Sequence, residues 1–285
     1  MDYKFMERMR ELSEDDATGS VAEIYQEIKE YYAAPYVSSL FRHLATYPGL
    51  LEWIWKITLP AFQTGLIQNV GWKRVDISAL KPLTPLSNEE LADMQIDNVS
   101  KNMIIETCLT FTRVSPVNLI FAGCMSHLLL GERSDESALN KNEFPLPPCL
   151  SPLPKMLPWE DMSESELAVI NIFSTTLAGE TFIPGIYRIL ARWPLYLKHV
   201  ANELGPLLHD PVIIDICETI ADKVFYSASE IWGNLDLTEK EPPLDENQKQ
   251  KVLAAIAAYR GTSPQMVGFG TLLLNALPSN GLNSP

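Results

Sequence analysis

The amino-acid sequence contains one segment twice. Residues 22–60 align without a gap to residues 168–206, and the identical pairs include Arg42 with Arg188. Many other pairs keep their chemical character. Two copies of one segment predict two copies of one structural unit.

A second block repeats further along each copy and in the same order. Here Ser115 and Pro116 align with Ser263 and Pro264. The chain is therefore expected to fold as an intramolecular pseudo-dimer of two tandem repeats. The surface between such copies is a natural place for a pocket.

Helical periodicity dominates the pattern, so the fold class is predicted to be all-α. Val37, Leu40, Phe41 and Leu44 form an apolar stripe at helical spacing, and its equivalent in the second copy does the same. The pattern predicts further helices, which cover residues 20–33, 49–62, 89–95, 99–112, 117–130, 164–178, 195–208, 211–232, 246–259 and 265–277.

Capping residues mark several of the expected helix starts. Ser115 and Ser263, each followed by proline, are interpreted as N-caps of new helices. Ser163 with Glu166 has the pattern of a capping box. Asp210 before a proline is a further expected N-cap, and Asp16 or Ser20 could cap the first helix.

A proline-rich segment lies between the two copies. Residues 144–159 combine many prolines with apolar side chains, which is typical of a stiff, extended connection that packs along a surface. The expected organisation is a first helical repeat at 1–131, a linker at 132–163 and a second helical repeat at 164–285.

The net charge of −14 limits the partners of the chain. It disfavours nucleic acid, whose phosphates need a basic surface, and anionic membrane surfaces. The longest apolar run, residues 119–130, is too short to span a bilayer. The polar, acidic start of the sequence is unlike a secretory signal, so a cytoplasmic location is expected.

The four cysteines, Cys108, Cys124, Cys149 and Cys217, are widely spaced. They give neither a disulfide framework nor a metal-binding pattern, and neither a cofactor nor a metal is expected. Cys124 and His127 have the spacing of the CxxC of AhpD-like peroxidases, with histidine in place of the second cysteine. A reactive thiol at Cys124 is therefore one alternative.

Several short motifs resemble the group I 2-haloacid dehalogenases, and together they extend over nearly the whole chain. They lie at residues 15–20, 24–25, 34–37, 44–49, 111–129, 159–166 and 191–194. The resemblance implies an all-α pseudo-dimer with an AhpD-like architecture and an active site between its repeats. In that family an aspartate activates a water that attacks C2 of a short 2-haloacid and expels halide, without a metal.

The resemblance also implies particular site residues. The aspartate position falls on Ile186, and the position of an asparagine that holds the water falls on Ser115. Substrate contacts are implied for Tyr36, Ser39 and Gly185, together with Ile186 and Ser115. Isoleucine cannot accept a proton, so the usual general base is absent from position 186.

Each of these residues also has a structural interpretation. Ile186 continues an apolar stripe and fits a helical core. The matched pair Arg42 and Arg188 fits either structural ion pairs or carboxylate binding. Glu106, Glu180 and Glu218 are the candidates for a relocated base, although the surface is the ordinary place for a glutamate.

The sequence is therefore consistent with two functions. The first is a divergent 2-haloacid dehalogenase that uses a relocated base. The second is a relative without hydrolytic activity, which binds a small ligand or performs different chemistry on the same scaffold. The expected partner is a small molecule such as a short carboxylic acid, and homodimer formation is left open.

Overall fold

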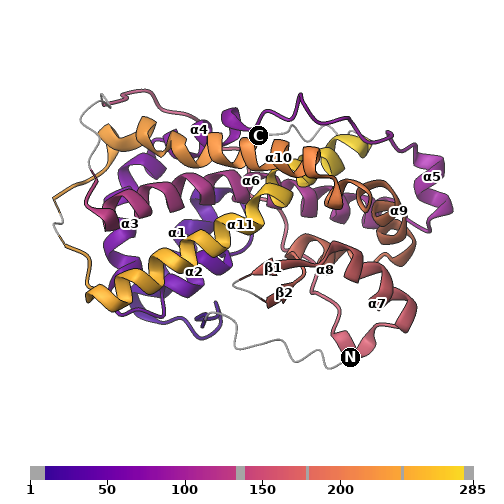
Figure 1. Ribbon diagram of the computed structural model, residues 1–285, viewed down its shortest axis with the longest axis horizontal. Coiled ribbons are helices and arrows are strands. Elements are labelled where there is room, and N and C mark those ends of the chain that lie inside the picture. Colours follow the sequence, from indigo (N-terminus) through magenta and orange to yellow (C-terminus); the bar gives the residue numbers. More distant parts are fainter. Residues whose placement is uncertain (1–9, 133–138, 178–179, 239–240, 279–285) are drawn as a thin grey trace.

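The fold is mostly helical, as predicted. The computed structural model describes residues 10–132, 139–177, 180–238 and 241–278. The first part of the chain forms α1 (Gly19–Tyr32), α2 (Ser39–Leu44), α3 (Leu50–Gln63), α4 (Leu66–Arg74), α5 (Asn88–Asp93) and α6 (Asn98–Leu130). The second part forms α7 (Glu164–Ile170), α8 (Gly185–Leu190), α9 (Pro194–Leu204), α10 (Pro211–Tyr226) and α11 (Glu246–Ala276) (Figure 1).

Short elements connect the helices of the second part. They are the 3₁₀ helices Trp159–Asp161, Asn171–Phe173, Leu207–His209 and Ser227–Asn234, and the strands β1 (Thr175–Leu177) and β2 (Glu180–Phe182). The strands form an antiparallel hairpin in which Thr175 pairs with Phe182. The helix predicted over 164–178 is thus too long, because β-branched threonines favour extended backbone over helix.

The prediction that Pro116 and Pro264 begin new helices is wrong. Both prolines lie inside long helices, α6 and α11. Ser115 and Ser263 are therefore interior residues and not N-caps. A proline in a helix interior removes one hydrogen bond, a cost of about 3 kcal/mol. Extensive burial of both helices offsets that cost.

The observed caps explain where the helices begin. Asp97 accepts a hydrogen bond from the Ser100 amide at 2.7 Å and starts α6. The expected capping box of Ser163 and Glu166 is confirmed at the start of α7. Asp210 caps α10 as predicted, whereas α1 begins after Thr18 without a side-chain cap, contrary to the expectation for its N-terminus.

Helix α6 is the centre of the molecule. It packs against α4, α10 and α11, and α11 runs obliquely across it (Figure 1). Buried apolar residues from both predicted repeats form one contiguous core. Among the described helices, α6 alone has the length and composition of a membrane span, and 94% of its most apolar window is buried inside the protein. That degree of burial is typical of a core helix.

The proline-rich segment packs on the helices through side-chain and backbone hydrogen bonds. The Phe144 amide donates to the Thr64 carbonyl, and Arg113 Nη1 donates to the Pro148 carbonyl at 2.8 Å.

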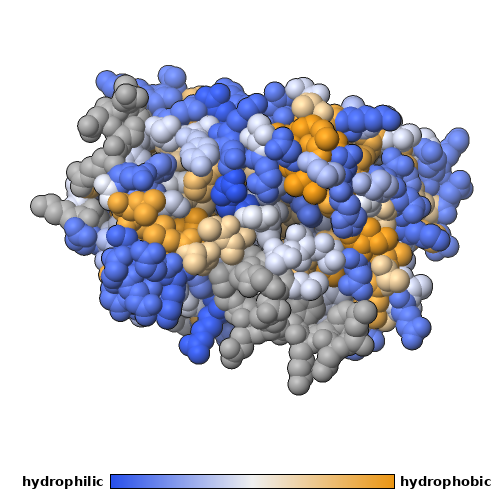
Figure 2. Space-filling model, in the orientation of Figure 1, coloured by the Kyte–Doolittle hydropathy of each residue, from blue (hydrophilic) through white to orange (hydrophobic). Residues whose placement is uncertain are grey.

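Hydrophilic residues cover much of the face in Figure 2, and apolar residues form separate patches. Val212, on α10, is one of the exposed apolar residues.

Gly123 of α6 allows the closest approach between α6 and the end of α10. A Cβ atom at this position would lie 2.4 Å from the carbonyl oxygen of Phe225 and 2.8 Å from Cβ of Ala228. Both distances are shorter than atoms tolerate, so backbone would have to move. Gly261 of α11, by contrast, has no atom within 4 Å of such a Cβ.

We therefore expect opposite effects from two glycine substitutions. Gly123→Ala should lower the free energy of unfolding by about 1–3 kcal/mol, because it overpacks the core. Gly261→Ala should raise it by up to about 1 kcal/mol, because alanine favours helix and meets no obstacle. Urea denaturation followed by circular dichroism measures both. Equal stabilities of the two variants would contradict this account of α6 packing.

Candidate functional site

A cavity of about 390 Å³ lies where both parts of the chain meet. Its walls come from α2 with the loop before it, from α6, from α8 with the loop before it, and from α11. The proline-rich segment contributes Leu153, Met156 and Trp159. The cavity has the size and mixed polarity of a small-molecule site.

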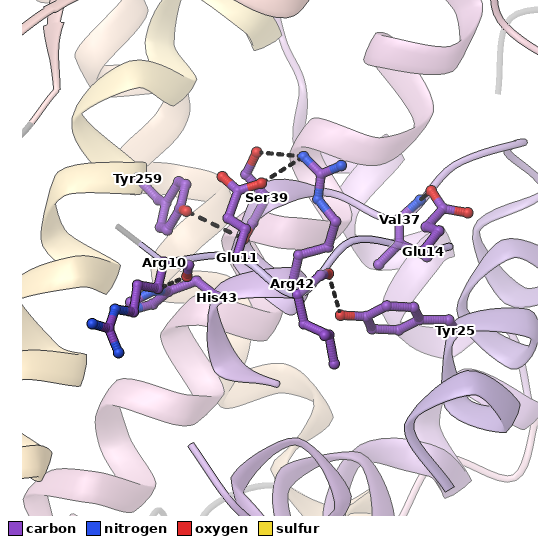
Figure 3. Close-up of polar contacts among 10 residues, drawn as sticks. Arg10, Glu11, Glu14, Tyr25, Val37, Ser39, Arg42, His43 and Tyr259 are labelled. Atoms are coloured by element: carbon purple, nitrogen blue, oxygen red, sulfur yellow. Dashed lines mark hydrogen bonds and ion pairs between the residues drawn. The ribbon is translucent and has the colours of Figure 1, made fainter. Parts of the chain in front are cut away.

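The segment before α1 holds a carboxylate at this cavity. Glu11 Oε2 forms an ion pair of 2.7 Å with Arg42 Nη2, which also donates to Ser39 Oγ at 3.1 Å (Figure 3). The backbone of the segment is fixed beside α2, since the Leu12 amide donates to the Arg42 carbonyl and Tyr25 Oη donates to the Leu12 carbonyl. Glu11 is therefore held in place by backbone contacts as well as by its charge.

Three arginines and one glutamate are the charged residues of the lining. Arg260 forms ion pairs with Asp222 and, at 3.5 Å, with Glu218 on α10. Arg188 donates to the Leu157 carbonyl at 2.8 Å, and its guanidinium lies 3.4 Å from the centre of the Trp159 ring. Arg42 and Arg260 are thus paired with carboxylates of the protein. An anionic ligand would reach these arginines by competing with those carboxylates.

Some buried polar atoms of the lining have no hydrogen-bond partner among the described residues. They include Ser38 Oγ, Arg42 Nε and Asn118 Oδ1. Ser38 is the N-cap residue of α2, yet its side chain makes no capping bond. Buried polar groups are normally paired, so their presence beside a cavity indicates a place for a polar ligand or water.

Tyr36 adds a neutral donor to the same wall. Burial raises the pKa of its phenol well above the usual value, an effect that nearby Arg42 opposes and Glu14 reinforces. The hydroxyl therefore stays protonated at neutral pH. The Tyr36 ring packs against Phe111 of α6 at a centroid distance of 5.9 Å.

Four of the five residues that the sequence singled out lie in this lining. They are Tyr36, Ser39, Ser115 and Gly185. Ile186 has no exposed surface and is not part of the lining. It packs in the core, which agrees with its structural interpretation.

The carboxylate at the cavity is not one of those considered from the sequence. Glu106 borders a separate depression beside the proline-rich segment, and Glu218 pairs with Arg260. The side chain of Glu180 lies outside the described part of the chain. Sequence reasoning missed Glu11, because nothing local distinguishes it from the other acidic residues near the N-terminus.

The structure gives no support to a reactive thiol at Cys124. The residue is fully buried, and burial raises the pKa of its thiol well above the usual range. Burial likewise raises the pKa of Cys108 to about 12 and that of Cys217 to about 11. In the described part of the chain, no group of three or more His, Cys, Asp or Glu side chains is arranged to hold a metal ion.

This fold is that of the D-2-haloacid dehalogenases. A solved structure of such an enzyme in complex with L-LA superposes with a TM-score of 0.74, at 17% identity, and 94% of this chain and 95% of that chain are covered. A mutant in complex with D-2-CPA gives 0.72 at 17% identity, with 94% of each chain covered. A further mutant structure gives 0.71 at 19% identity, with 93% of each covered.

The sequence is also distantly similar to a particular enzyme of this kind. It is 23% identical over 211 residues to an (R)-2-haloacid dehalogenase of Pseudomonas putida, which covers 71% of this chain and 70% of that enzyme. No protein-family model matches the chain. The comparisons thus support the expected resemblance to 2-haloacid dehalogenases at low identity.

The burial of the thiols predicts how the folded protein reacts with Ellman's reagent. Only Cys149 is exposed, so one thiol per chain should react quickly, and all four should react after unfolding in guanidinium. A Cys149→Ser variant is the control, because it should lose the fast phase. Fast labelling of Cys124 in the folded protein would contradict the buried environment described above.

Proposed function

We propose that the chain binds a 2-substituted carboxylic acid in the central cavity and hydrolyses its C2–halogen bond. The observation that carries the proposal is the cluster of Arg42, Glu11 and Ser39 at one wall of that cavity (Figure 3). A guanidinium is the best protein partner for a carboxylate, because it donates two parallel hydrogen bonds. The structures of the D-2-haloacid dehalogenases with 2-chloropropionate and lactate, which are small carboxylic acids, support this choice of ligand.

Carboxylate binding at Arg42 would use donor groups that line the cavity. Arg42 Nε has no partner among the described residues, and the neutral phenol of Tyr36 is a further donor. The ligand carboxylate competes with Glu11 for Arg42 Nη2. Binding would therefore replace an internal ion pair by one with the ligand and would free the Glu11 carboxylate.

Glu11 is the general base in this proposal. It removes a proton from a water molecule, the water oxygen forms a bond to C2, and the halide leaves with the electron pair of the broken C2–halogen bond. The products are a 2-hydroxy acid, a halide ion and a proton on Glu11. The resemblance assigns this role to position 186, where this chain has Ile186, so a different carboxylate is required.

Asn118 is the proposed support for the attacking water. It lies three residues after Ser115 on α6, and residues at this spacing are neighbours on a helix face. Its Oδ1 is buried beside the cavity without a partner among the described residues. The amide would replace the asparagine that the resemblance implies at position 115.

We also propose that the cavity lies between two copies of one structural unit. Members of matched sequence pairs line it together, and these pairs are Tyr36 with Phe182, Ser39 with Gly185, Arg42 with Arg188, and Ser115 with Ser263. The shared lining supports an internal repeat, because equivalent residues of two copies meet at the axis that relates them. In this arrangement the proposed general base, Glu11, comes only from the segment before α1.

A non-hydrolytic function is the second candidate. The ion pair between Glu11 and Arg42 favours it, since the carboxylate is already engaged by a guanidinium. In that case the chain binds a carboxylic acid without turnover. The two candidates share the ligand class and differ only in the chemical step.

Halide release separates the two candidates. The protein is incubated with D- and L-2-chloropropionate, and chloride is measured. We expect enzyme-like release from at least one enantiomer, and a loss of at least about 100-fold in the Glu11→Gln variant. The same variant should bind lactate at least as tightly as the unchanged protein, because Arg42 loses its internal competitor.

The Glu14→Gln variant is the matched control for Glu11→Gln. Glu14 lies on the same segment and contacts the Val37 amide and Lys29, and it is not itself part of the cavity lining. It should leave chloride release unchanged apart from effects on stability. Lactate binding without any chloride release from the unchanged protein would reject hydrolysis and favour the second candidate.

The role of Arg42 is tested by binding alone. Arg42→Met should weaken lactate binding by about 10- to 100-fold in titration calorimetry, because it removes a charge-assisted hydrogen bond. Arg74→Met is the control, since Arg74 forms an exposed ion pair with Glu230 outside the cavity. Equal lactate affinity of both variants would reject Arg42 as the carboxylate site.

A further inference from the structure

The cavity is larger than a three-carbon acid needs. Its volume is about 390 Å³, equivalent to roughly 13 molecules of liquid water at about 30 Å³ each. A 2-halopropionate has only six non-hydrogen atoms, so it would leave more than half of this volume to water. Cavities of this size ordinarily hold ligands with an extended apolar body.

The lining is rich in aromatic rings. Tyr36, Phe111, Trp159, Phe182 and Tyr259 all take part in it. Aromatic rings interact best with another flat ring, in tilted or offset geometries at centroid distances of about 4.5–7 Å. Tyr36 and Phe111 already form such a tilted pair, with an interplanar angle of 43°. A third ring added to this wall would gain contacts that a methyl group cannot make.

Gly185 lets Phe111 and Met156 pack closely against the start of α8. A Cβ atom at Gly185 would lie 3.3 Å from Phe111 Cζ and 3.4 Å from Met156 Cε. The missing side chain therefore borders two apolar side chains. Arg188 lies one helical turn further along α8, so a ligand that packs on the Phe111 and Met156 side chains could keep its carboxylate near an arginine.

The proline-rich wall of the cavity is held in position by α8 and the residues after it. Arg188 donates to the Leu157 carbonyl at 2.8 Å, and Arg192 donates to the Lys155 carbonyl at 3.1 Å. These bonds fix the backbone of the proline-rich segment on both sides of Met156.

The Met156 side chain is 47% exposed, and its flexible thioether can adapt to a ring without disturbing the fold.

We propose that the preferred ligand is a 2-aryl carboxylic acid, in which a flat ring replaces the methyl group of 2-chloropropionate. The carboxylate binds at the arginines, and the ring lies against Phe111, Gly185 and Met156. The inference rests on the proposed function only for the carboxylate site. It adds the size and shape of the group on C2, which Gly185 and Met156 determine.

Lactate and mandelate form a matched pair of probes. Both are 2-hydroxy acids, and they differ only by a methyl against a phenyl group on C2, so their binding does not depend on turnover. Titration calorimetry at fixed salt should give mandelate an affinity at least about tenfold higher than lactate, because more apolar surface leaves water. Equal or weaker binding of mandelate would overturn the proposal.

The Gly185→Ala variant tests where the phenyl ring of mandelate binds. The added methyl group should reduce the affinity for mandelate by about tenfold and leave lactate affinity within about twofold. Gly261→Ala, whose Cβ has no atom within 4 Å, should leave both affinities unchanged. Equal losses for both acids in Gly185→Ala would overturn the assignment of the ring to this site.

A second variant covers the case in which Gly185→Ala fails to fold. Met156→Ala changes a side chain that is nearly half exposed, so folding should persist. It should weaken mandelate binding and leave lactate binding unchanged, and an unchanged ratio of the two would contradict the proposal. Failure of the carboxylate site itself has a different signature, which is absence of binding for both acids.

Discussion

The burial of the middle of α6, between Ile104 and Met125, is the constraint on which the rest of the structure depends. This 33-residue helix runs through the middle of the protein and does not stop at Pro116. A helix can cross an apolar core because its backbone groups pair with one another. One face of α6 carries Phe111, Ser115 and Asn118 to the cavity at successive turns, while Gly123 allows the end of α10 to pack closely.

Four helices and two non-helical segments form the walls of the cavity. Helices α2, α6, α8 and α11 provide fixed positions for Arg42, Ser115 and Arg188. The segment before α1 and the proline-rich segment complete the enclosure, and hydrogen bonds between side chains and backbone hold both of them. Two of the three arginines in the lining, Arg42 and Arg260, are paired with carboxylates of the protein.

Some features of the site could be predicted from local patterns, and others could not. The helical class, the capping box at Ser163 and the cap at Asp210 follow from interactions within a few residues. Glu11 could not be found in this way, since it reaches Arg42 only after the chain folds back on α2. The continuation of α6 through Pro116 was missed for a related reason, because tertiary packing outweighs the local cost of proline.

The sequence by itself determined the helical class and four residues of the cavity wall: Tyr36, Ser39, Ser115 and Gly185. These depend on periodicity, on short-range capping and on a resemblance along the chain. The tertiary structure alone decided which charges share the cavity. The physical reason is that ion pairs and cavities arise from contacts between distant segments, and local sequence does not specify such contacts.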